Sequence, residues 1–398
     1  MNATAAVSTA KPRAFALELD VLRRLAALLM ILNHAGFALL SPADATDSAS
    51  AVAVFLGGFA PVVFFFATGF GIALASGPKG RPLDATGLLW KALLLVVADQ
   101  LFFWRAGVVW GIDFFSFIAL STVVVTLVAQ LRRPVPVCIG LILLLLGLRY
   151  GLGPALRSQL HGTSVLDWVL GATTIPHISY PLSPWMVYPL LGFVLGRMYA
   201  RVDLRSPQPR NRWLLIGLAL MLGTLGAAAW MATLNTGFFR WGMVSAAFFV
   251  LSLGVLLAAG LLSMLLVMAQ RPLAGALALR GVASFAVIPI HYALLDACDA
   301  TLSLPIGQGA FAVLVIGIAA ISFVVASWFA ARVSSAFFTT HRRALIVLLL
   351  SVLGAAVVGV VLGSPRETAR MVLLVLTGQL VVAALLGLRL SWPGAART

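Results

Sequence analysis

Charged residues are scarce in this sequence. Only 10% of its 398 residues are Asp, Glu, Lys or Arg, whereas a soluble domain carries about 25%. Hydrophobic residues make up 62%, and the mean hydropathy is +1.06. A chain with so few polar side chains cannot cover its own surface in water. The composition therefore excludes the soluble globular and disordered classes, and it predicts a protein whose partner is the lipid bilayer.

Cysteine is also rare, with Cys138 and Cys298 as the two residues of this type, which excludes a disulfide scaffold. The expected topology places them near opposite membrane faces, so we expect two free thiols because a disulfide needs Cα atoms within about 7 Å. The sequence has no His-x-x-x-His or Glu-x-x-His pair, no Gly-x-x-x-x-Gly-Lys-Ser/Thr loop and no Gly-x-Ser-x-Gly elbow. These absences argue against a metal site, nucleotide hydrolysis and an α/β-hydrolase nucleophile.

Acidic residues number 12 against 27 Lys and Arg, which gives a formal net charge of +15. Such an excess often indicates nucleic-acid binding, but here the basic residues lie in short connectors between apolar runs. We therefore expect no nucleic-acid partner and interpret the excess through its distribution between the two sides of the membrane.

Long apolar runs are what the chain has in abundance. No run alternates every second residue, so helices are the expected spanning structures. A span needs about 20 apolar residues. Twelve candidates are present: 16–40, 51–76, 86–106, 111–131, 135–150, 179–200, 213–234, 242–269, 282–299, 308–333, 343–363 and 370–390. The predicted fold is an all-α polytopic membrane bundle, with the first ten helices in a core domain (1–333) and two further helices in 334–398.

The basic residues predict the orientation of these spans. With both termini in the cytoplasm, 21 of the 27 Lys and Arg residues fall on the inner side and six on the outer side. Positive charge favours the cytoplasmic side of a membrane protein. The asymmetry therefore supports an even number of helices.

Ionisable side chains inside spans are costly, and they are the first functional candidates. Arg23 and His34 are eleven residues apart in the first span, which corresponds to three helical turns plus about 20°, so they share one face at a separation of roughly 16 Å. The alternatives are that Arg23 is a topology anchor, with Asp20 pairing with Arg23 or Arg24, and that His34 is a packing histidine.

Three further candidates are His291, Asp99 and Asp113. His291 follows Pro289 inside its span, where the helix is expected to be broken, and a packing role is the alternative. Either carboxylate is able to accept the second N–H of the His34 ring and fix its tautomer. The alternative for both is a solvated position near the outer face.

Four segments, in order, resemble the integral-membrane acyltransferases, which include the acyltransferase-3 and heparan-α-glucosaminide N-acetyltransferase-like proteins. The first segment, LDVLRRLAALLMILNH (19–34), is similar to their Leu-Asp-x-x-Arg signature followed by ten residues and His. The others are GGFAPVVFFFATGFGIALA (57–75), YPLSPWMVYPLLGFVLGR (180–197) and ASFAVIPIHYALL (283–295). The resemblance covers roughly 16–333, and the last two helices match nothing that we recognise.

The resemblance implies a multi-pass enzyme of a bacterial inner membrane that moves an acyl group, usually acetyl, from cytoplasmic acyl-CoA to an outer acceptor. His34 is then the general base or the acyl carrier, and no metal is expected. The inner basic residues would hold the phosphates of acyl-CoA: Arg23, Arg24, Lys79 and Arg81.

The acceptor is expected to bind at the outer entrance, and a glycan or lipid-linked glycan is the expected acceptor because aromatic and polar side chains suit a sugar ring. The candidate residues for this contact are Tyr180, Trp185, His177 and Asp167. The alternative for the two aromatic residues is an interfacial belt. Two other functions remain open, a secondary transporter with intramembrane His and Asp groups and a non-catalytic membrane subunit. The sequence leaves the oligomeric state open.

Overall fold

The structure is a computed structural model of the chain. It describes residues 17–47, 49–76, 85–105, 108, 110–201, 207–234, 244–333, 340–361 and 369–388. Within these ranges the protein is helical and has no strand, apart from two isolated bridges near Ile178. The all-α fold class predicted from the apolar runs is confirmed.

Each of the twelve predicted runs contains a helix. In chain order the helices are α1 (Leu17–Leu39), α2 (Pro42–Asp47), α3 (Ala49–Gly57), α4 (Ala60–Ser76), α5 (Ala85–Arg105), α6 (Phe114–Ala129), α7 (Pro134–Leu146), the π-helix η1 (Gly147–Leu152), α8 (Gly153–Leu156), the 3₁₀ turn η2 (Arg157–Gln159), α9 (Val165–Leu170), α10 (Leu182–Trp185), α11 (Val187–Tyr199), α12 (Pro207–Thr233), α13 (Ala246–Ala269), α14 (Arg271–Leu277), α15 (Val282–Thr301), α16 (Gln308–Val333), α18 (Arg342–Val361) and α19 (Ala369–Gly387).

Nine stretches of the described chain are long and apolar enough to cross a membrane, with α3 and α4 counted as one. Helix α6 and the apolar part of α19 are shorter, and α11 has 13 residues after a non-helical Ser183. The protein is therefore a multi-pass membrane bundle, while the number of twelve spans stays a prediction. Both termini lie outside the described residues.

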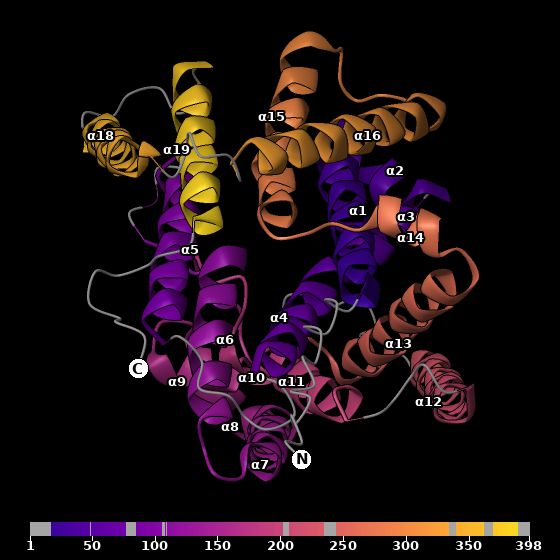
Figure 1. Cartoon of the computed structure of the whole chain (residues 1–398). Helices are drawn as coiled ribbons and strands as arrows, with labels where there is room; N and C mark the ends of the chain where they lie inside the picture. Colours follow the sequence, from indigo (N-terminus) through magenta and orange to yellow (C-terminus); the bar gives the residue numbers. More distant parts are fainter. Residues whose placement is uncertain are drawn as a thin grey trace, which may run out of the picture.

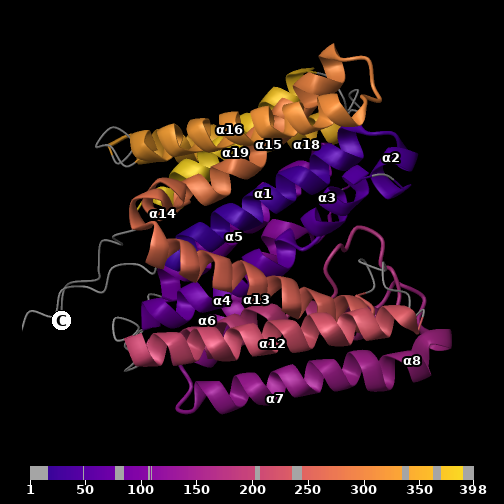
Figure 2. The same cartoon turned by 90° about the vertical axis from the view of Figure 1, so that its right-hand side faces the viewer.

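Helix α1 occupies the centre of the bundle. It packs against α3, α4, α13, α15 and α16, and its path between them can be followed in Figures 1 and 2. The buried residues of α1 lie on several sides of the helix and include Asp20, Ala27, Ile31 and Ala35. A helix with buried residues all around it has neighbours on most sides, so the residues of α1 are placed deep inside the molecule.

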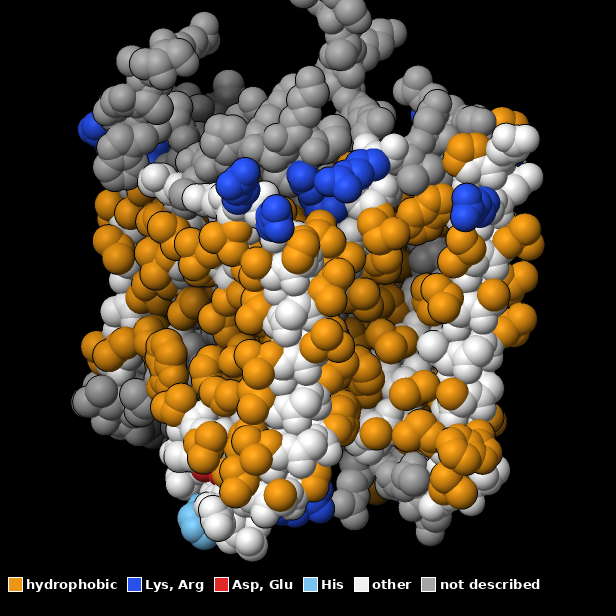
Figure 3. All heavy atoms as spheres, turned by 90° about the horizontal axis from the view of Figure 1, so that it is seen from below, with side chains coloured by type: hydrophobic (Ala, Val, Ile, Leu, Met, Phe, Trp, Pro, Cys, Tyr) orange, Lys and Arg blue, Asp and Glu red, His pale blue; other side chains and the backbone are white. Residues whose placement is uncertain are grey.

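The periphery is built differently. Helix α12 packs mainly on α13 and stands at one edge, whereas α18 and α19 lie at another edge beside α5 (Figure 1). The space-filling view shows a broad hydrophobic band with Lys and Arg side chains gathered along one rim (Figure 3). A hydrophobic band with basic residues at its border is typical of a protein surrounded by lipid.

Helices α4 and α11 form the closest helix pair around the core. A Cβ atom on Gly69 would lie 1.8 Å from the carbonyl oxygen of Pro189, and one on Gly192 would lie 2.1 Å from that of Phe66. Real Cβ atoms do not approach backbone atoms this closely, so the two helices touch only because both positions are glycine. Small residues of this kind allow close packing of membrane helices. This contact fixes the wall of the bundle behind α1.

We expect Gly192→Ala to destabilise the protein, because its new methyl group would collide with the backbone of α4. The cost expected for overpacking is about 1–3 kcal/mol. It is measured as a lower midpoint of thermal unfolding in nanodiscs. The matched control is Gly223→Ala on α12, where no atom lies within 4 Å of the added Cβ; that variant should unfold at or slightly above the wild-type midpoint. Equal midpoints for the two variants would show that the close contact is not required.

Candidate functional site

A cavity of about 400 Å³ lies between α1, α5, α6 and α15, beside the junction of α3 and α4. Much of its lining is aromatic or aliphatic. Its polar side chains come from α1, α5, the start of α6, the segment before α10 and α15: Asn33, His34, Asp99, Arg105, Asp113, Ser179, Tyr180 and Tyr292. The fold therefore brings the predicted His34, Asp99 and Asp113 to the wall of one cavity.

His34 and His291 form a direct pair across α1 and α15. Nδ1 of His34 lies 2.9 Å from Nε2 of His291, although the two residues are 257 positions apart in the chain. Their rings stack with centroids 5.2 Å apart and planes inclined by 17°. The hydroxyl of Tyr292 lies 3.3 Å from Nε2 of His34. The partner that fixes the His34 ring is thus a second imidazole and not a carboxylate.

The hydrogen bonds determine the tautomer of both rings. Nδ1 of His291 lies 3.0 Å from the carbonyl oxygen of Val287, which is able only to accept, so this nitrogen donates. Nε2 of the neutral His291 is then an acceptor, and Nδ1–H of His34 donates to it. Nε2 of His34 is left without a proton and accepts from the Tyr292 hydroxyl. The nitrogen with basic character therefore lies on the cavity side of the pair.

Burial explains why the pair is neutral. The side chain of His291 is 0% exposed, and His34 is partly exposed towards the cavity. No carboxylate contacts either ring among the described residues. A charged imidazole without a counter-ion in a membrane interior is strongly disfavoured. The rings therefore satisfy each other as neutral donor and acceptor.

Asp99 has a structural role at the start of α6. Its carboxylate accepts hydrogen bonds from the backbone N–H groups of Asp113, Phe115 and Ser116, at 2.8, 3.4 and 3.2 Å. These groups have no partner within a helix that begins at Phe114, and the N-cap residue Asp113 gives no side-chain cap. Asp99 of α5 thus supplies the cap from a neighbouring helix, and this holds Asp113 at the cavity wall.

Asp113 is the acidic side chain that is available for a ligand. It lines the cavity together with Ser179. Ion pairs within the described residues join Arg23 and Arg280 to Asp20 and join Arg105 to Asp296, so Asp113 belongs to none of them. A carboxylate in an apolar cavity with no cationic partner favours a positively charged ligand group.

The predicted inner cluster lies at the opposite end of α1. Arg23 is bound to Asp20 at 3.0 Å, and Arg280 reaches the other oxygen of Asp20 at 3.1 Å. Arg24 donates to the carbonyl of Ala276 and stacks over the ring of Phe323. The pairing of Asp20 with Arg23, one alternative from the sequence, is therefore present. Lys79 and Arg81 lie outside the described residues.

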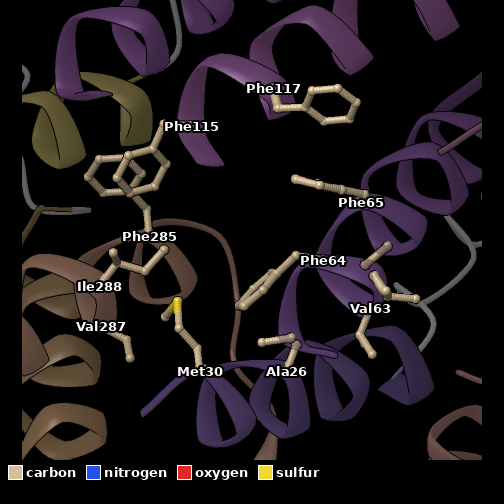
Figure 4. Close-up of a cluster of buried hydrophobic side chains, with 14 of the residues drawn as sticks. Ala26, Met30, Val63, Phe64, Phe65, Phe115, Phe117, Phe285, Val287 and Ile288 are labelled. Atoms are coloured by element: carbon tan, nitrogen blue, oxygen red, sulfur yellow. The ribbon is translucent and has the colours of Figure 1, made fainter. Parts of the chain in front are cut away.

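An apolar cluster lies between this inner end and the cavity. Phe115 stacks on Phe285 with ring centroids 4.6 Å apart, and Met30 and Ile288 lie beside them (Figure 4). Met30, Phe115 and Ile288 line the cavity, whereas Arg23 does not. The expected shared face of Arg23 and His34 is therefore divided by packed side chains in this conformation.

The four predicted acceptor residues fall in different surroundings. Tyr180 lines the cavity, whereas Trp185 is 0% exposed and packs against Phe65 and Tyr188. His177 is exposed at the surface. Asp167 takes part in a capping box with Ser164 at the start of α9, and hydrogen bonds from Ser164 lower the pKa of Asp167 to about 2. Tyr180 is thus the one of the four that the fold places at the cavity.

Sequence reasoning missed three polar side chains of the cavity: Arg105, Ser179 and Tyr292. Tyr292 had a signal, because it follows His291 in an otherwise apolar helix. Arg105 and Ser179 had none, since both look like ordinary residues at the ends of spans. No group of three His, Cys, Asp or Glu side chains suited to a metal ion is found among the residues that the structure describes. Cys138 and Cys298 are free thiols, as expected.

Comparison with known proteins gives one family. The model of the catalytic region of heparan-alpha-glucosaminide N-acetyltransferase matches residues 16–232, more than half of the chain. This confirms one branch of the resemblance inferred from the sequence, but it does not support the acyltransferase-3 label. The match includes α1 to α11 and nearly all of α12, while α15 with His291 lies beyond it. No curated protein and no solved structure shows a significant similarity to the chain.

We expect Asp99→Ala to destabilise the protein, because three backbone N–H groups at the start of α6, two of them buried, lose their acceptor. An unsatisfied buried donor costs about 1–3 kcal/mol, so the thermal unfolding midpoint should fall clearly. Asp99→Asn retains one acceptor oxygen and should lie between Asp99→Ala and the wild type. If Asp99→Ala unfolds at the wild-type temperature, the carboxylate is not the cap of this helix.

Proposed function

This chain belongs to the heparan-alpha-glucosaminide N-acetyltransferase catalytic family, and we propose that it transfers an acetyl group from cytoplasmic acetyl-CoA to an amine of an outer acceptor. The observation that supports the proposal best is the His34–His291 pair, which leaves a basic ring nitrogen at the wall of a cavity. The proposed acceptor is an amino sugar of a glycan or glycolipid. The proposed location is a bacterial inner membrane.

The step that forms the new bond needs one base. The acceptor nitrogen attacks the thioester carbon, and a C–N bond forms while the C–S bond breaks. Nε2 of His34 takes the proton from the acceptor nitrogen and passes it to the sulfur of CoA, which leaves as the thiol. A positioned general base of this type contributes about 10²–10⁴-fold to a rate. His291 acts as a positioning residue, because it holds His34 in the tautomer that this step requires.

Asn33 is the proposed donor to the oxyanion. Its amide nitrogen donates to the carbonyl of Val54 at 2.9 Å, so the side chain is held in place, and it lines the cavity beside His34. The amide has a second N–H group that is able to bind the developing negative charge on the thioester oxygen. On an ideal helix the side chains of Asn33 and His34 point about 100° apart, yet both line the cavity.

Asp113 supports an amine rather than a hydroxyl as the acceptor group. Its carboxylate has no cationic partner among the described ion pairs, so a protonated amine would supply the missing charge. The ammonium group passes one proton to the Asp113 carboxylate before it attacks, and His34 takes a second proton from the same nitrogen as the C–N bond forms; both side chains line the cavity. Asp113 releases its proton to water after the reaction. A neutral hydroxyl would leave the buried carboxylate uncompensated.

The donor is proposed to bind from the inner end of α1. Arg23 and Arg24 offer positive charge there for the phosphates of acetyl-CoA, with Lys79 and Arg81 as further proposed contacts. The thin pantetheine arm would extend past Met30 to bring the thioester to His34. This requires the apolar cluster of Met30, Phe115, Phe285 and Ile288 to open, because the cavity does not extend to Arg23.

We expect His34→Ala to reduce acetyl transfer by about 10²–10⁴-fold, because the general base is removed. The assay follows release of the CoA thiol by purified protein in nanodiscs with acetyl-CoA and glucosamine. His291→Ala should give a smaller loss, since the base remains but is no longer oriented, and the unfolding midpoint of both variants checks folding. A secondary transporter would instead carry its substrate without any need for acetyl-CoA.

We expect Asp113→Asn to raise the KM for an amine acceptor at least tenfold and to leave the KM for acetyl-CoA near the wild-type value. The reason is that the amide removes the charge that pairs with the ammonium group while it keeps the shape of the side chain. Steady-state kinetics with each substrate varied in turn measures both constants. An unchanged acceptor KM would contradict the assignment of Asp113 to the amine.

A further inference from the structure

The hydroxyl of Tyr292 covers the basic nitrogen of His34. It lies 3.3 Å from Nε2, and this nitrogen carries no proton because Nδ1–H of the same ring donates to His291. The hydroxyl is therefore the donor of this hydrogen bond. A ring nitrogen has one lone pair, so in this arrangement Nε2 accepts from Tyr292 and not from a molecule in the cavity.

The ring of Tyr292 is held in place by three other rings. Its centroid lies 4.8 Å from that of His34, 4.5 Å from that of His291 and 5.0 Å from that of Phe102. Rotation of the hydroxyl moves only its hydrogen, so the oxygen stays beside Nε2 as long as the ring remains packed. An acceptor amine would have to displace this oxygen in order to contact Nε2 directly.

The Tyr292 oxygen also has unused capacity as a hydrogen-bond acceptor. The side chain lines the cavity. Among the residues that the structure describes, His34 is the hydrogen-bond partner of this hydroxyl, and no donor contacts its oxygen. A phenolic oxygen is able to accept a hydrogen bond while its hydrogen is donated. An amine in the cavity is therefore able to donate to Tyr292 while Tyr292 donates to Nε2.

We propose that Tyr292 is a catalytic residue, through which the proton of the acceptor amine reaches His34. The inference rests on the proposed function and adds the path of its proton. As the C–N bond forms and the C–S bond breaks, the acceptor nitrogen gives its proton to the Tyr292 oxygen, and the hydroxyl gives its own proton to Nε2. The same hydroxyl then carries the proton from His34 back to the sulfur of CoA, so both side chains end neutral.

No role for Tyr292 comes from the similarity to the family. Tyr292 belongs to α15, and this helix lies beyond the matched residues 16–232. The role follows from the position of its hydroxyl between the basic nitrogen and the cavity.

The test is Tyr292→Phe, which keeps the ring and removes the hydroxyl. Loss of the hydroxyl should lower kcat at least about tenfold, since proton transfer to the base loses its path. Transfer is followed after rapid mixing of the protein in nanodiscs with acetyl-CoA and glucosamine, at a pH where glucosamine is the free amine. The matched control is Tyr188→Phe, which should keep the wild-type kcat because the Tyr188 hydroxyl bonds Ser252 and does not line the cavity.

A second readout separates this role from that of a tyrosine that only orients His34. The transfer rate is measured in mixtures of H₂O and D₂O. Two protons move together when the hydroxyl takes part, so the wild-type rate should follow a curve against the D₂O fraction, whereas the transfer of one proton gives a straight line. A straight line for the wild type, or a wild-type kcat in Tyr292→Phe, would overturn the inference. The first of these results does not depend on the folding of any variant. If the wild type transfers no acetyl group to glucosamine, the proposed function itself fails.

Discussion

The structure depends on the way in which a neutral imidazole is satisfied inside a membrane bundle. Each ring of the His34–His291 pair has one donor and one acceptor, and the carbonyl of Val287 decides which nitrogen has which role. A carboxylate would have imposed a tautomer as well, but it would also have brought a charge that is costly in this environment. The second histidine gives orientation without that cost. It also ties α1 to α15, two helices that are far apart in the chain.

Much of the fold was predictable because the membrane restricts the chain to helices of a known length. The apolar runs located every main helix. Helical periodicity predicted a shared face for Arg23 and His34, but His34 lines the cavity and Arg23 does not. The partners across helices were not predictable. Nothing in the residues near Asp99 shows that it caps α6, or that Arg105 pairs with Asp296, because these contacts depend on how helices pack and not on local spacing. Trp185 shows the same limit, since its position suggested an outer entrance and the packing of α4 and α11 buries it.

The site joins a part of the chain that matches the family and a part that does not. Residues 16–232 provide His34, the Asp99 cap, Asp113 and Tyr180, whereas α15 provides His291 and Tyr292. The two parts also differ in how their helices are held. Helices α4 and α11 are locked through glycine contacts, whereas α15 contains Pro289 close to His291 and so lacks one backbone hydrogen bond.

The hydrogen-bonded chain of Tyr292, His34 and His291 ends at the carbonyl of Val287. A peptide oxygen does not become a proton carrier at physiological pH, so this series of rings has a closed end. A proton on Nε2 of His34 is therefore exchanged only with groups in the cavity, and the rings offer it no route beyond Val287. The paired histidines therefore hold one ring nitrogen in a fixed orientation at the cavity and do not form a relay of protons across the bundle.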